Sequence, residues 1–215
     1  MYSSISENNG IAALTEQDQK VYSVGISTAG LAEIRMTQGN PNRHIIATTI
    51  DPEGAKFAKK RIEEAGLEDH IDVKMEDIAK PLPYSDGYFD FVYARLVLHY
   101  LPKNDLIRAL NELYRVLKVS GKLFVVVRSL ACSEAHDESA TLDPDTGMIT
   151  YVYNGKTLSR YFHTEESIQN YLTSSGFHIK HVRSFEEKLC VDFQRTQLTG
   201  KEYSLIEVFA SKVDT

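Results

Sequence analysis

The stretch VYSVGISTAGLAE, from Val21 to Glu33, carries the first expectation for the fold. A β-rich run reaches Gly25 and turns at once into a stretch that favours a helix. Many α/β enzymes bind a nucleotide-like cofactor at such a turn, because the first N–H groups of the helix are free to bind polar ligands. Gly25 and Gly30 are the only glycines in this stretch. A functional cofactor-binding turn and a degraded one are therefore both open interpretations.

The next part of the chain alternates between strand-like and helical segments. The expected strands are Lys20–Gly25, His44–Asp51, Ile71–Glu76, Phe89–Ala94 and Lys122–Ser129. The last of them is almost continuously apolar, which is typical of a strand buried on both faces of a parallel sheet. Apolar residues recur at helical spacing in two of the intervening segments: Ala55, Ala58, Ile62 and Ala65, then Leu106, Leu110, Leu113 and Leu117. This alternation predicts a parallel sheet with helices on both faces.

The last third of the chain has a different pattern. A helix is expected from Thr164, a favourable N-cap, to Gly176. Two strands, His178–Phe185 and Glu202–Ser211, follow without a helix between them, which predicts an antiparallel end to the sheet. Residues 130–163 contain turn signals on either side of MITYVY and predict a small hairpin or flap. We expect one domain over residues 1–215, with a short N-terminal segment over residues 1–19.

Composition excludes several classes of protein. The 215 residues carry a formal net charge of −6 without a basic cluster, which argues against a nucleic-acid-binding surface. The N-terminal residues lack the basic-then-apolar pattern of a signal peptide, and no run approaches the roughly 18 apolar residues of a membrane span. Cys132 and Cys190 are expected to be thiols in a reducing cytosol. A cytoplasmic protein without a membrane partner is therefore expected, and its oligomeric state stays open.

Four stretches resemble the class I S-adenosylmethionine-dependent methyltransferases of the small-molecule type. They are VYSVGISTAGLAE, IDPEGAKFAKKRIEEAGLEDHIDVKMEDI, LPYSDGYFDFVYARLVLHYLP and ALNELYRVLKVSGKLFVV. The resemblance covers roughly Lys20 to Ser211. It implies a Rossmann-like, doubly wound α/β fold, whose mostly parallel seven-stranded sheet has one antiparallel strand near the C-terminus. It also implies S-adenosyl-L-methionine as cofactor and S-adenosyl-L-homocysteine as product.

The resemblance assigns a set of residues to the cofactor. Gly25 would let the backbone approach it closely, Asp51 would accept hydrogen bonds from the ribose hydroxyls, and Asp77 would bind the adenine amino group. Asp51 follows Gly25 by 51 − 25 = 26 residues, near the roughly 20 expected of an acidic ribose binder. The full expected set is Ser23, Gly25, Ile26, Ser27, Asp51, Pro52, Asp77, Ile78, Arg95 and Leu96.

The glycine-rich turn departs from the family pattern. Ser23 stands where the family usually has an acid that helps to hold the cofactor's ammonium group, and Ser27 and Ala29 replace glycines. A strained serine and a lost hydrogen bond to a charge together cost on the order of 2–4 kcal/mol, or about 30- to 1000-fold in affinity. Two hypotheses follow: a methyltransferase with a small-molecule acceptor, and a non-catalytic binding or scaffold module with a degraded cofactor site.

The acceptor side has one candidate catalytic residue. Methyl transfer is a direct displacement that mainly needs orientation, and a base is needed only where the acceptor loses a proton. His99 is the candidate base, with helix packing or capping as the ordinary alternative. Candidate substrate-binding residues are Tyr100, Arg128, Tyr161 and His163, each of which has an ordinary structural role as its alternative. The histidines show no metal-ligand spacing, and no NPPY-like sequence follows the fourth strand, which disfavours base or amide N-methylation.

Three short patterns point elsewhere, and each is weak. Gly25 and Gly30 fit the outer glycines of a dinucleotide-binding G-x-G-x-x-G, but the middle one is missing. The run YRVLK, from Tyr114 to Lys118, matches the Tyr-x-x-x-Lys of short-chain dehydrogenases, which chance readily explains. CSEAHDE, from Cys132 to Glu138, gathers possible metal ligands in what reads as a solvated loop.

Overall fold

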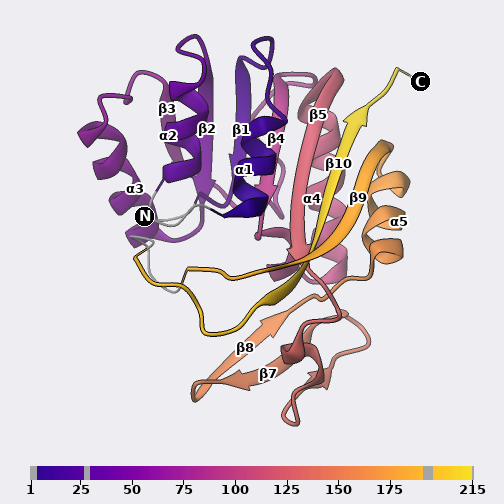
Figure 1. Cartoon of the computed structure of the whole chain (residues 1–215). Coiled ribbons are helices and arrows are strands. Elements are labelled where there is room, and N and C mark those ends of the chain that lie inside the picture. Colours follow the sequence, from indigo (N-terminus) through magenta and orange to yellow (C-terminus); the bar gives the residue numbers. More distant parts are fainter. Residues whose placement is uncertain (1–3, 27–29, 191–195, 215) are drawn as a thin grey trace.

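The computed structural model describes residues 4–26, 30–190 and 196–214. Its centre is a seven-stranded sheet with the strand order β3-β2-β1-β4-β5-β10-β9 (Figure 1). β10 runs antiparallel to both of its neighbours, and the pairs on the other side of β5 are parallel. The strands are β1 Lys20–Val24, β2 His44–Thr49, β3 Ile71–Met75, β4 Phe89–Arg95, β5 Leu117–Arg128, β9 Phe177–Glu187 and β10 Tyr203–Lys212. The expected doubly wound, mostly parallel sheet is confirmed.

Helices cover both faces of this sheet, as expected (Figure 1). One face packs against α1 (Ile5–Ala12), α2 (Leu31–Gln38) and α3 (Pro52–Glu64), and the other against α4 (Lys103–Val116) and α5 (Glu165–Ser174). Successive strand residues point to opposite faces, so each strand supplies both cores. In β1, for example, Val21 joins the core under α2 and α3, while Tyr22 joins the core under α4.

The turn into β5 differs from the expected one. α4 ends at Val116 and β5 begins directly at Leu117, before the expected start at Lys122. The left-handed residue in this stretch is Ser120, with φ +64°. A Cβ on Gly121 would lie 2.7 Å from both the Leu117 Cγ and the Lys118 carbonyl oxygen. The glycine therefore permits close packing of a bulged strand and does not itself make the turn.

Residues 130–163 form a second, small sheet beyond the carboxyl ends of the parallel strands (Figure 1). Its strands are β6 (Thr141–Leu142), β7 (Ile149–Tyr153) and β8 (Lys156–Arg160), paired antiparallel in that order. The expected hairpin is the β7–β8 pair. Its two-residue turn is Asn154-Gly155, with φ +50° and +72°, values that suit a primed turn.

The N-terminal helix α1 was not foreseen, because its sequence has no apolar stripe. Ser4 caps it by accepting a hydrogen bond from the Glu7 N–H at 3.1 Å. Glu7 forms an ion pair with Arg35 of α2 at 2.9 Å. Gly10 sits so close to the sheet that a Cβ would lie 2.4 Å from the Tyr93 ring. Polar contacts and the close approach of one glycine therefore hold α1 against the sheet and α2.

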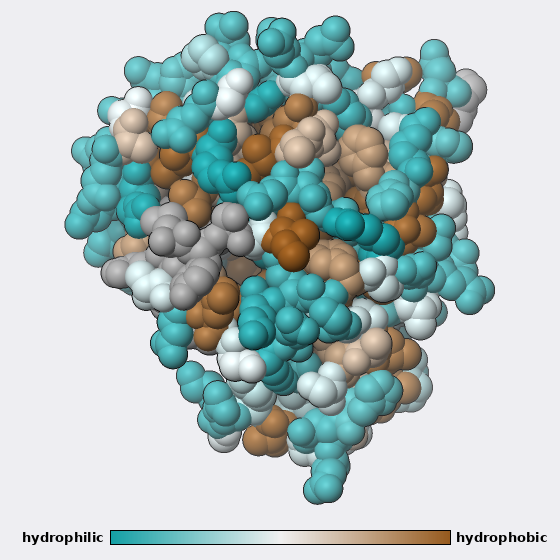
Figure 2. Space-filling model, in the orientation of Figure 1, coloured by the Kyte–Doolittle hydropathy of each residue, from teal (hydrophilic) through white to brown (hydrophobic). Residues whose placement is uncertain are grey.

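In the part of the chain that the structure describes, no helix is both long and apolar enough to cross a membrane. On the face shown in Figure 2, hydrophobic residues are scattered among hydrophilic ones.

Candidate functional site

A cleft of about 480 Å³ lies at the carboxyl ends of β1, β2, β3 and β4. Open parallel sheets bind their ligands at this edge. Seven of the ten expected cofactor residues line it: Gly25, Ile26, Asp51, Asp77, Ile78, Arg95 and Leu96. Pro52 begins α3 beside the cleft without lining it, and Ser27 lies outside the described residues. Sequence reasoning did not assign Val24, Thr49, Ile50, Glu76, Val97 and Leu101, which complete the lining with Tyr100.

Gly25 is required at the end of β1 for two independent reasons. Its φ of +74° lies in the left-handed region, where a side chain costs about 1–2 kcal/mol. A Cβ at this position would also lie 2.7 Å from Val97 Cγ2 and 2.9 Å from Val97 Cβ. Gly25 therefore lets the end of β1 pack directly against Val97 at the exit of β4, and both residues line the cleft.

The two aspartates that the resemblance assigns to the cofactor also have local structural roles. Asp51 is the N-cap of α3, and its Oδ1 accepts a hydrogen bond from the Glu53 N–H at 3.2 Å. Asp77 Oδ1 accepts a hydrogen bond from the Ala79 N–H at 3.0 Å. A carboxylate has about four acceptor positions on its two oxygens. Capping therefore leaves acceptor capacity for the hydroxyl and amino groups of a nucleoside.

Glu76 is a cleft residue that the sequence did not reveal. The hydroxyls of Tyr22 and Tyr84 donate to its two oxygens, at 2.9 and 2.6 Å. Burial and this carboxylate raise the pKa of both tyrosines far above their usual range. The only sequence signal was an acid directly after β3, and the family resemblance assigned that role to Asp77.

Ser23 faces away from the cleft. It is 1% exposed, and its hydroxyl donates to Glu33 Oε1 of α2 at 2.6 Å. The resemblance expects an acid in place of this serine. The chain instead has a buried acid ten residues later (33 − 23 = 10), one hydrogen bond away from the serine. A carboxylate thus remains close to the glycine turn, although it comes from a different element.

Arg95 connects the cleft to the N-terminal helix. Its Nε donates to Ser6 Oγ at 2.8 Å, and its Nη2 donates to Ser4 Oγ at 2.7 Å. The same Nη2 lies 3.6 Å from a carboxylate oxygen of Glu187, at the end of β9. The following residue, Leu96, has φ +56°, a strained conformation for leucine that is characteristic of functional sites. Arg95 therefore joins the end of β4 to α1 and β9 on the methionine side of the expected site.

The five residues expected on the acceptor side come together in space. The Tyr161 N–H donates to the His99 carbonyl oxygen at 2.8 Å, and the His163 N–H donates to the Arg128 carbonyl oxygen at 3.0 Å. The rings of His99 and Tyr100 are stacked, with centroids 4.7 Å apart. Because Tyr100 lines the cleft, this cluster begins where the cofactor cleft ends.

Two histidines of the cluster, His99 and His163, are buried, which favours their neutral form. Burial lowers the pKa of His99 well below its usual value, and the nearby Arg128, Arg160 and His163 lower it further. Burial alone lowers the pKa of His163 to about 4. Three buried atoms here have no hydrogen-bond partner within the described part of the chain: His99 Nδ1, Arg128 Nη1 and His163 Nε2. A buried polar atom without a partner costs about 1–3 kcal/mol. Of the three, Arg128 Nη1 is compensated in part, because it lies 3.6 Å from Glu134 Oε1.

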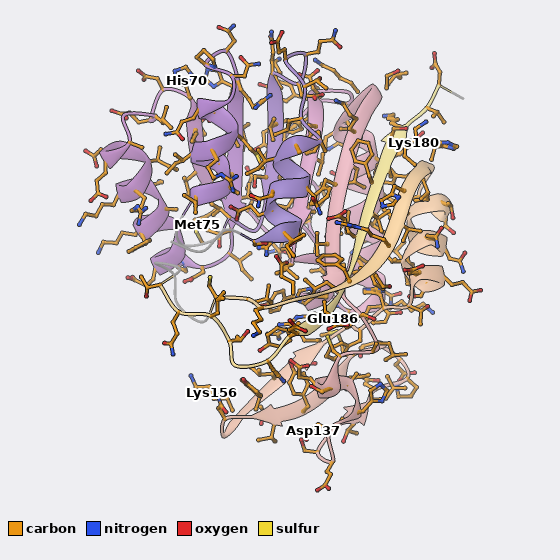
Figure 3. All side chains as sticks on the ribbon, viewed as in Figure 1. His70, Met75, Asp137, Lys156, Lys180 and Glu186 are labelled. Carbon is orange, nitrogen blue, oxygen red and sulfur yellow. The ribbon has the colours of Figure 1, made fainter. Side chains whose placement is uncertain are left out.

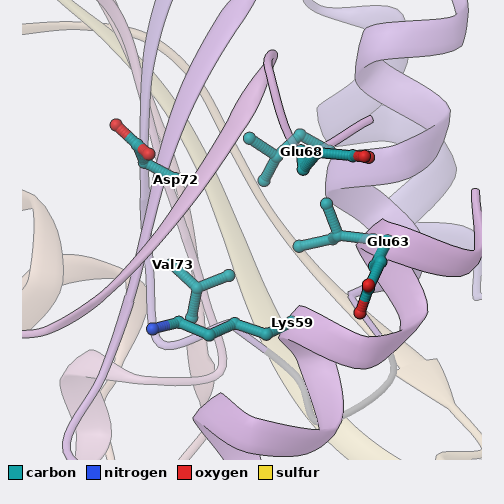
Figure 4. A pocket seen from close by; sticks show the side chains of 7 residues that line it. Lys59, Glu63, Glu68, Asp72 and Val73 are labelled. Atoms are coloured by element: carbon teal, nitrogen blue, oxygen red, sulfur yellow. The ribbon is translucent and has the colours of Figure 1, made fainter. Parts of the chain in front are cut away.

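Two other hollows lie outside the cleft. One, of about 400 Å³, lies between β5, the β7–β8 hairpin and the chain before β10, and Arg128, Lys156 and Tyr203 are among its lining residues. Figure 3 labels Lys156 at the hairpin, beyond the end of the main sheet at which Met75 closes β3. The other hollow, of about 370 Å³, lies between α3 and the edge strand β3 (Figure 4). It is lined in part by Glu63, Glu68 and Asp72 and contacts none of the expected site residues.

Comparisons with known proteins agree with this geometry. Residues 19–125, about half of the chain, match the methyltransferase domain family. A demethylmenaquinone methyltransferase of Lactobacillus johnsonii is 34% identical over 92 residues, which are 43% of this chain and 36% of that protein. The chain thus spans about a third of the length of this curated relative.

Two solved structures share the fold over almost the whole chain. A SAM-dependent methyltransferase from Methanosarcina mazei has a TM-score of 0.73 at 21% identity, with 100% of this chain and 99% of that chain covered. The [4+2]-cyclase SpnF has a TM-score of 0.68 at 18% identity, with 97% and 81% covered. The family match covers the strands and turns that build the cleft, and the order of the sheet agrees with it. The chain belongs to the methyltransferase domain family, and its fold is that of class I S-adenosylmethionine-dependent methyltransferases.

Proposed function

We propose that the chain binds S-adenosyl-L-methionine in the 480 Å³ cleft and catalyses transfer of its methyl group to a small-molecule acceptor. The observation that carries the proposal is the cleft itself. It joins a glycine that tolerates no Cβ, Gly25, to acids that follow two neighbouring strands, Asp51 and Asp77. A nucleoside with a ribose diol and an exocyclic amine matches these groups.

Different residues are proposed to bind different parts of the cofactor. Asp51 accepts hydrogen bonds from the ribose hydroxyls, Asp77 accepts one from the adenine amino group, and Ile78 packs on the adenine ring. Gly25 lets the backbone of the turn approach the ligand, and Arg95 and Leu96 border its amino-acid end. Bound S-adenosylmethionine supplies an electrophilic methyl group on a sulfonium. The protein then has to orient that group toward the acceptor and exclude water.

The acceptor is proposed to bind where Tyr100 meets the buried cluster. His99 Nδ1 is buried and makes no hydrogen bond to the described residues, so it is placed to hydrogen-bond an acceptor group. Burial and the nearby cations lower the pKa of His99, so it is a weak base, and a base role is proposed only for an acceptor with an acidic hydroxyl. The curated relative from Lactobacillus johnsonii is named for a quinone-type small molecule. The net charge of −6 opposes a polyanionic nucleic-acid substrate.

A second candidate function is a binding module without methyl transfer. Ser23 in place of the usual acid favours it, because this side chain faces Glu33 and not the cleft. The structural likeness to a protein titled a [4+2]-cyclase adds that this fold does not by itself fix the reaction.

Turnover distinguishes the two functions. The protein is incubated with S-adenosylmethionine and a panel of phenols, quinols and aromatic acids, and S-adenosylhomocysteine and methylated product are measured by mass spectrometry. Acceptor-dependent product that Asp51→Asn strongly reduces, while Asp69→Asn in an exposed turn does not, supports the enzyme. Cofactor binding without product from any acceptor favours the binding module, and failure to bind cofactor contradicts both the cleft assignment and the activity.

A further inference from the structure

The acceptor-side cluster carries an excess of positive charge that the cofactor does not explain. Arg128 and Lys201 approach the same oxygen, Glu134 Oε1, at 3.6 and 3.3 Å. Arg160 makes no ion pair with any carboxylate in the described ranges of the chain. Two cations thus share one carboxylate and a third has none, in a protein whose overall charge is negative. Such a local excess attracts anions.

The geometry connects this charge to the cofactor cleft. The Arg160 guanidinium lies over the Tyr100 ring, with its Cζ 4.0 Å from the ring centroid and its Nη2 3.4 Å from the phenol oxygen. Tyr100 lines the cleft and stacks on His99. The ring of Tyr100 therefore lies between Arg160 and the cleft in which the bound cofactor would present its methyl group.

Two buried imidazole nitrogens of the same cluster, His99 Nδ1 and His163 Nε2, lack a hydrogen-bond partner among the described residues. Beside them, Arg128 Nη1 makes no hydrogen bond to those residues and lies 3.6 Å from Glu134 Oε1. They come from three separate places in the chain: the short 3₁₀ helix after β4 (Leu98–Tyr100), the segment before α5, and the end of β5. The two imidazoles are neutral, so each is able to donate a hydrogen bond without adding charge. A ligand that satisfies several such donors needs several acceptor oxygens.

We propose that the acceptor carries a carboxylate or phosphate group, and that Arg128 and Arg160, with His99 and His163 as hydrogen-bond partners, bind this group next to the cofactor cleft. The proposal rests on the proposed function and names the substrate class of that same site. Guanidinium groups bind such oxyanions through paired, charge-assisted hydrogen bonds, which a neutral amide or alcohol does not match. Binding the anion fixes the distance of the acceptor from the methyl group.

Matched aromatic probes test this inference. Benzoate and phenyl phosphate are titrated calorimetrically against the protein, beside neutral benzamide and benzyl alcohol, with and without saturating S-adenosylhomocysteine. The expected result is that at least one anion binds at least about 10-fold more tightly than either neutral probe. Which of the two anions binds more tightly distinguishes a carboxylate site from a phosphate site.

Variants locate the anion. Arg160→Gln is expected to weaken anion binding about 10-fold or more without changing benzamide binding. It is preferred to a change at Arg128, whose loss would leave the buried carboxylate of Glu134 without one of its two cations. Arg108→Gln, on the exposed side of α4, is the matched control and is expected to change nothing. Equal binding of charged and neutral probes, no binding at the highest soluble concentration, or an anion preference that survives Arg160→Gln would overturn the proposal.

The titrations with S-adenosylhomocysteine distinguish a failure of this inference from a failure of the proposed function. Binding of S-adenosylhomocysteine without any anion preference rejects the anionic acceptor and leaves the methyltransferase assignment intact. An anion preference that depends on Arg160, in a protein that does not bind S-adenosylhomocysteine, rejects the methyltransferase assignment and leaves the anion site.

Discussion

Replacing Gly25 by alanine tests the close approach of β1 to the exit of β4. The new Cβ would occupy a left-handed backbone position, which costs about 1–2 kcal/mol, and would overlap with Val97, which costs about 1–3 kcal/mol more. The expected loss of unfolding free energy is therefore about 2–5 kcal/mol. With a urea m-value of about 2 kcal/mol/M, the unfolding midpoint should fall by about 1–2.5 M.

The chain offers a matched control for the backbone part of this loss. Gly66 has φ +65°, yet nothing lies within 4 Å of its added Cβ. Gly66→Ala should therefore cost only about 1–2 kcal/mol. Gly25→Ala and Val97→Ala should couple by about 1–3 kcal/mol in a double-mutant cycle, because the second change removes the overlap. Equal losses for the two glycine variants, together with no coupling to Val97, would refute the predicted contact.

Three further predictions concern charged residues around the cleft. Folding lowers the pKa of His163 from 6.5 to about 4, so the unfolding free energy should fall as the pH drops from 6.5 toward 4, by up to about 3 kcal/mol (2.5 pH units at about 1.36 each). In urea titrations at each pH, His163→Gln should flatten this dependence of the unfolding free energy on pH. An unchanged slope would contradict the burial of His163. Arg95→Ala leaves the carboxylate of Glu187 buried without its cation, so it should cost about 3 kcal/mol and expose α1 to hydrogen exchange; α1 amides with wild-type protection would exclude this connection. Glu76→Gln keeps one acceptor oxygen and replaces the other by a donor that faces a tyrosine hydroxyl, so it should cost about 1–3 kcal/mol; calorimetry that shows no change in the unfolding temperature would contradict the paired hydrogen bonds.

The strands and most helices could be predicted because burial leaves a period in the sequence. The apolar run over residues 123–127 and the stripe from Leu106 to Leu113 are direct results of packing on a sheet. Cleft residues could be predicted because they follow strands, and parallel strands bring their carboxyl ends to one edge. Asp51 and Asp77 are examples, and both line the cleft.

Other features depend on partners that are distant in the sequence. Nothing near Ser23 indicates that its hydroxyl bonds to Glu33, and nothing near Arg95 indicates that it binds Ser4 and Ser6 of the N-terminal helix. α1 lacked a sequence signal because polar contacts hold it in place of an apolar stripe. The roles of the individual cofactor and acceptor residues stay predictions, since the structure places them but contains no ligand to test them.

The central claim is that the cleft binds the adenosyl-amino-acid part shared by S-adenosylmethionine and its product, and calorimetric titration with S-adenosylhomocysteine tests it most directly. Asp51→Asn is the decisive variant, because asparagine caps a helix as well as aspartate but is a poorer acceptor for two ribose hydroxyls. We expect micromolar binding by the unchanged protein and by Asp69→Asn, and binding about 10- to 100-fold weaker by Asp51→Asn, with the unfolding free energy unchanged. No detectable heat at millimolar S-adenosylhomocysteine, or unchanged affinity in Asp51→Asn, would contradict the claim.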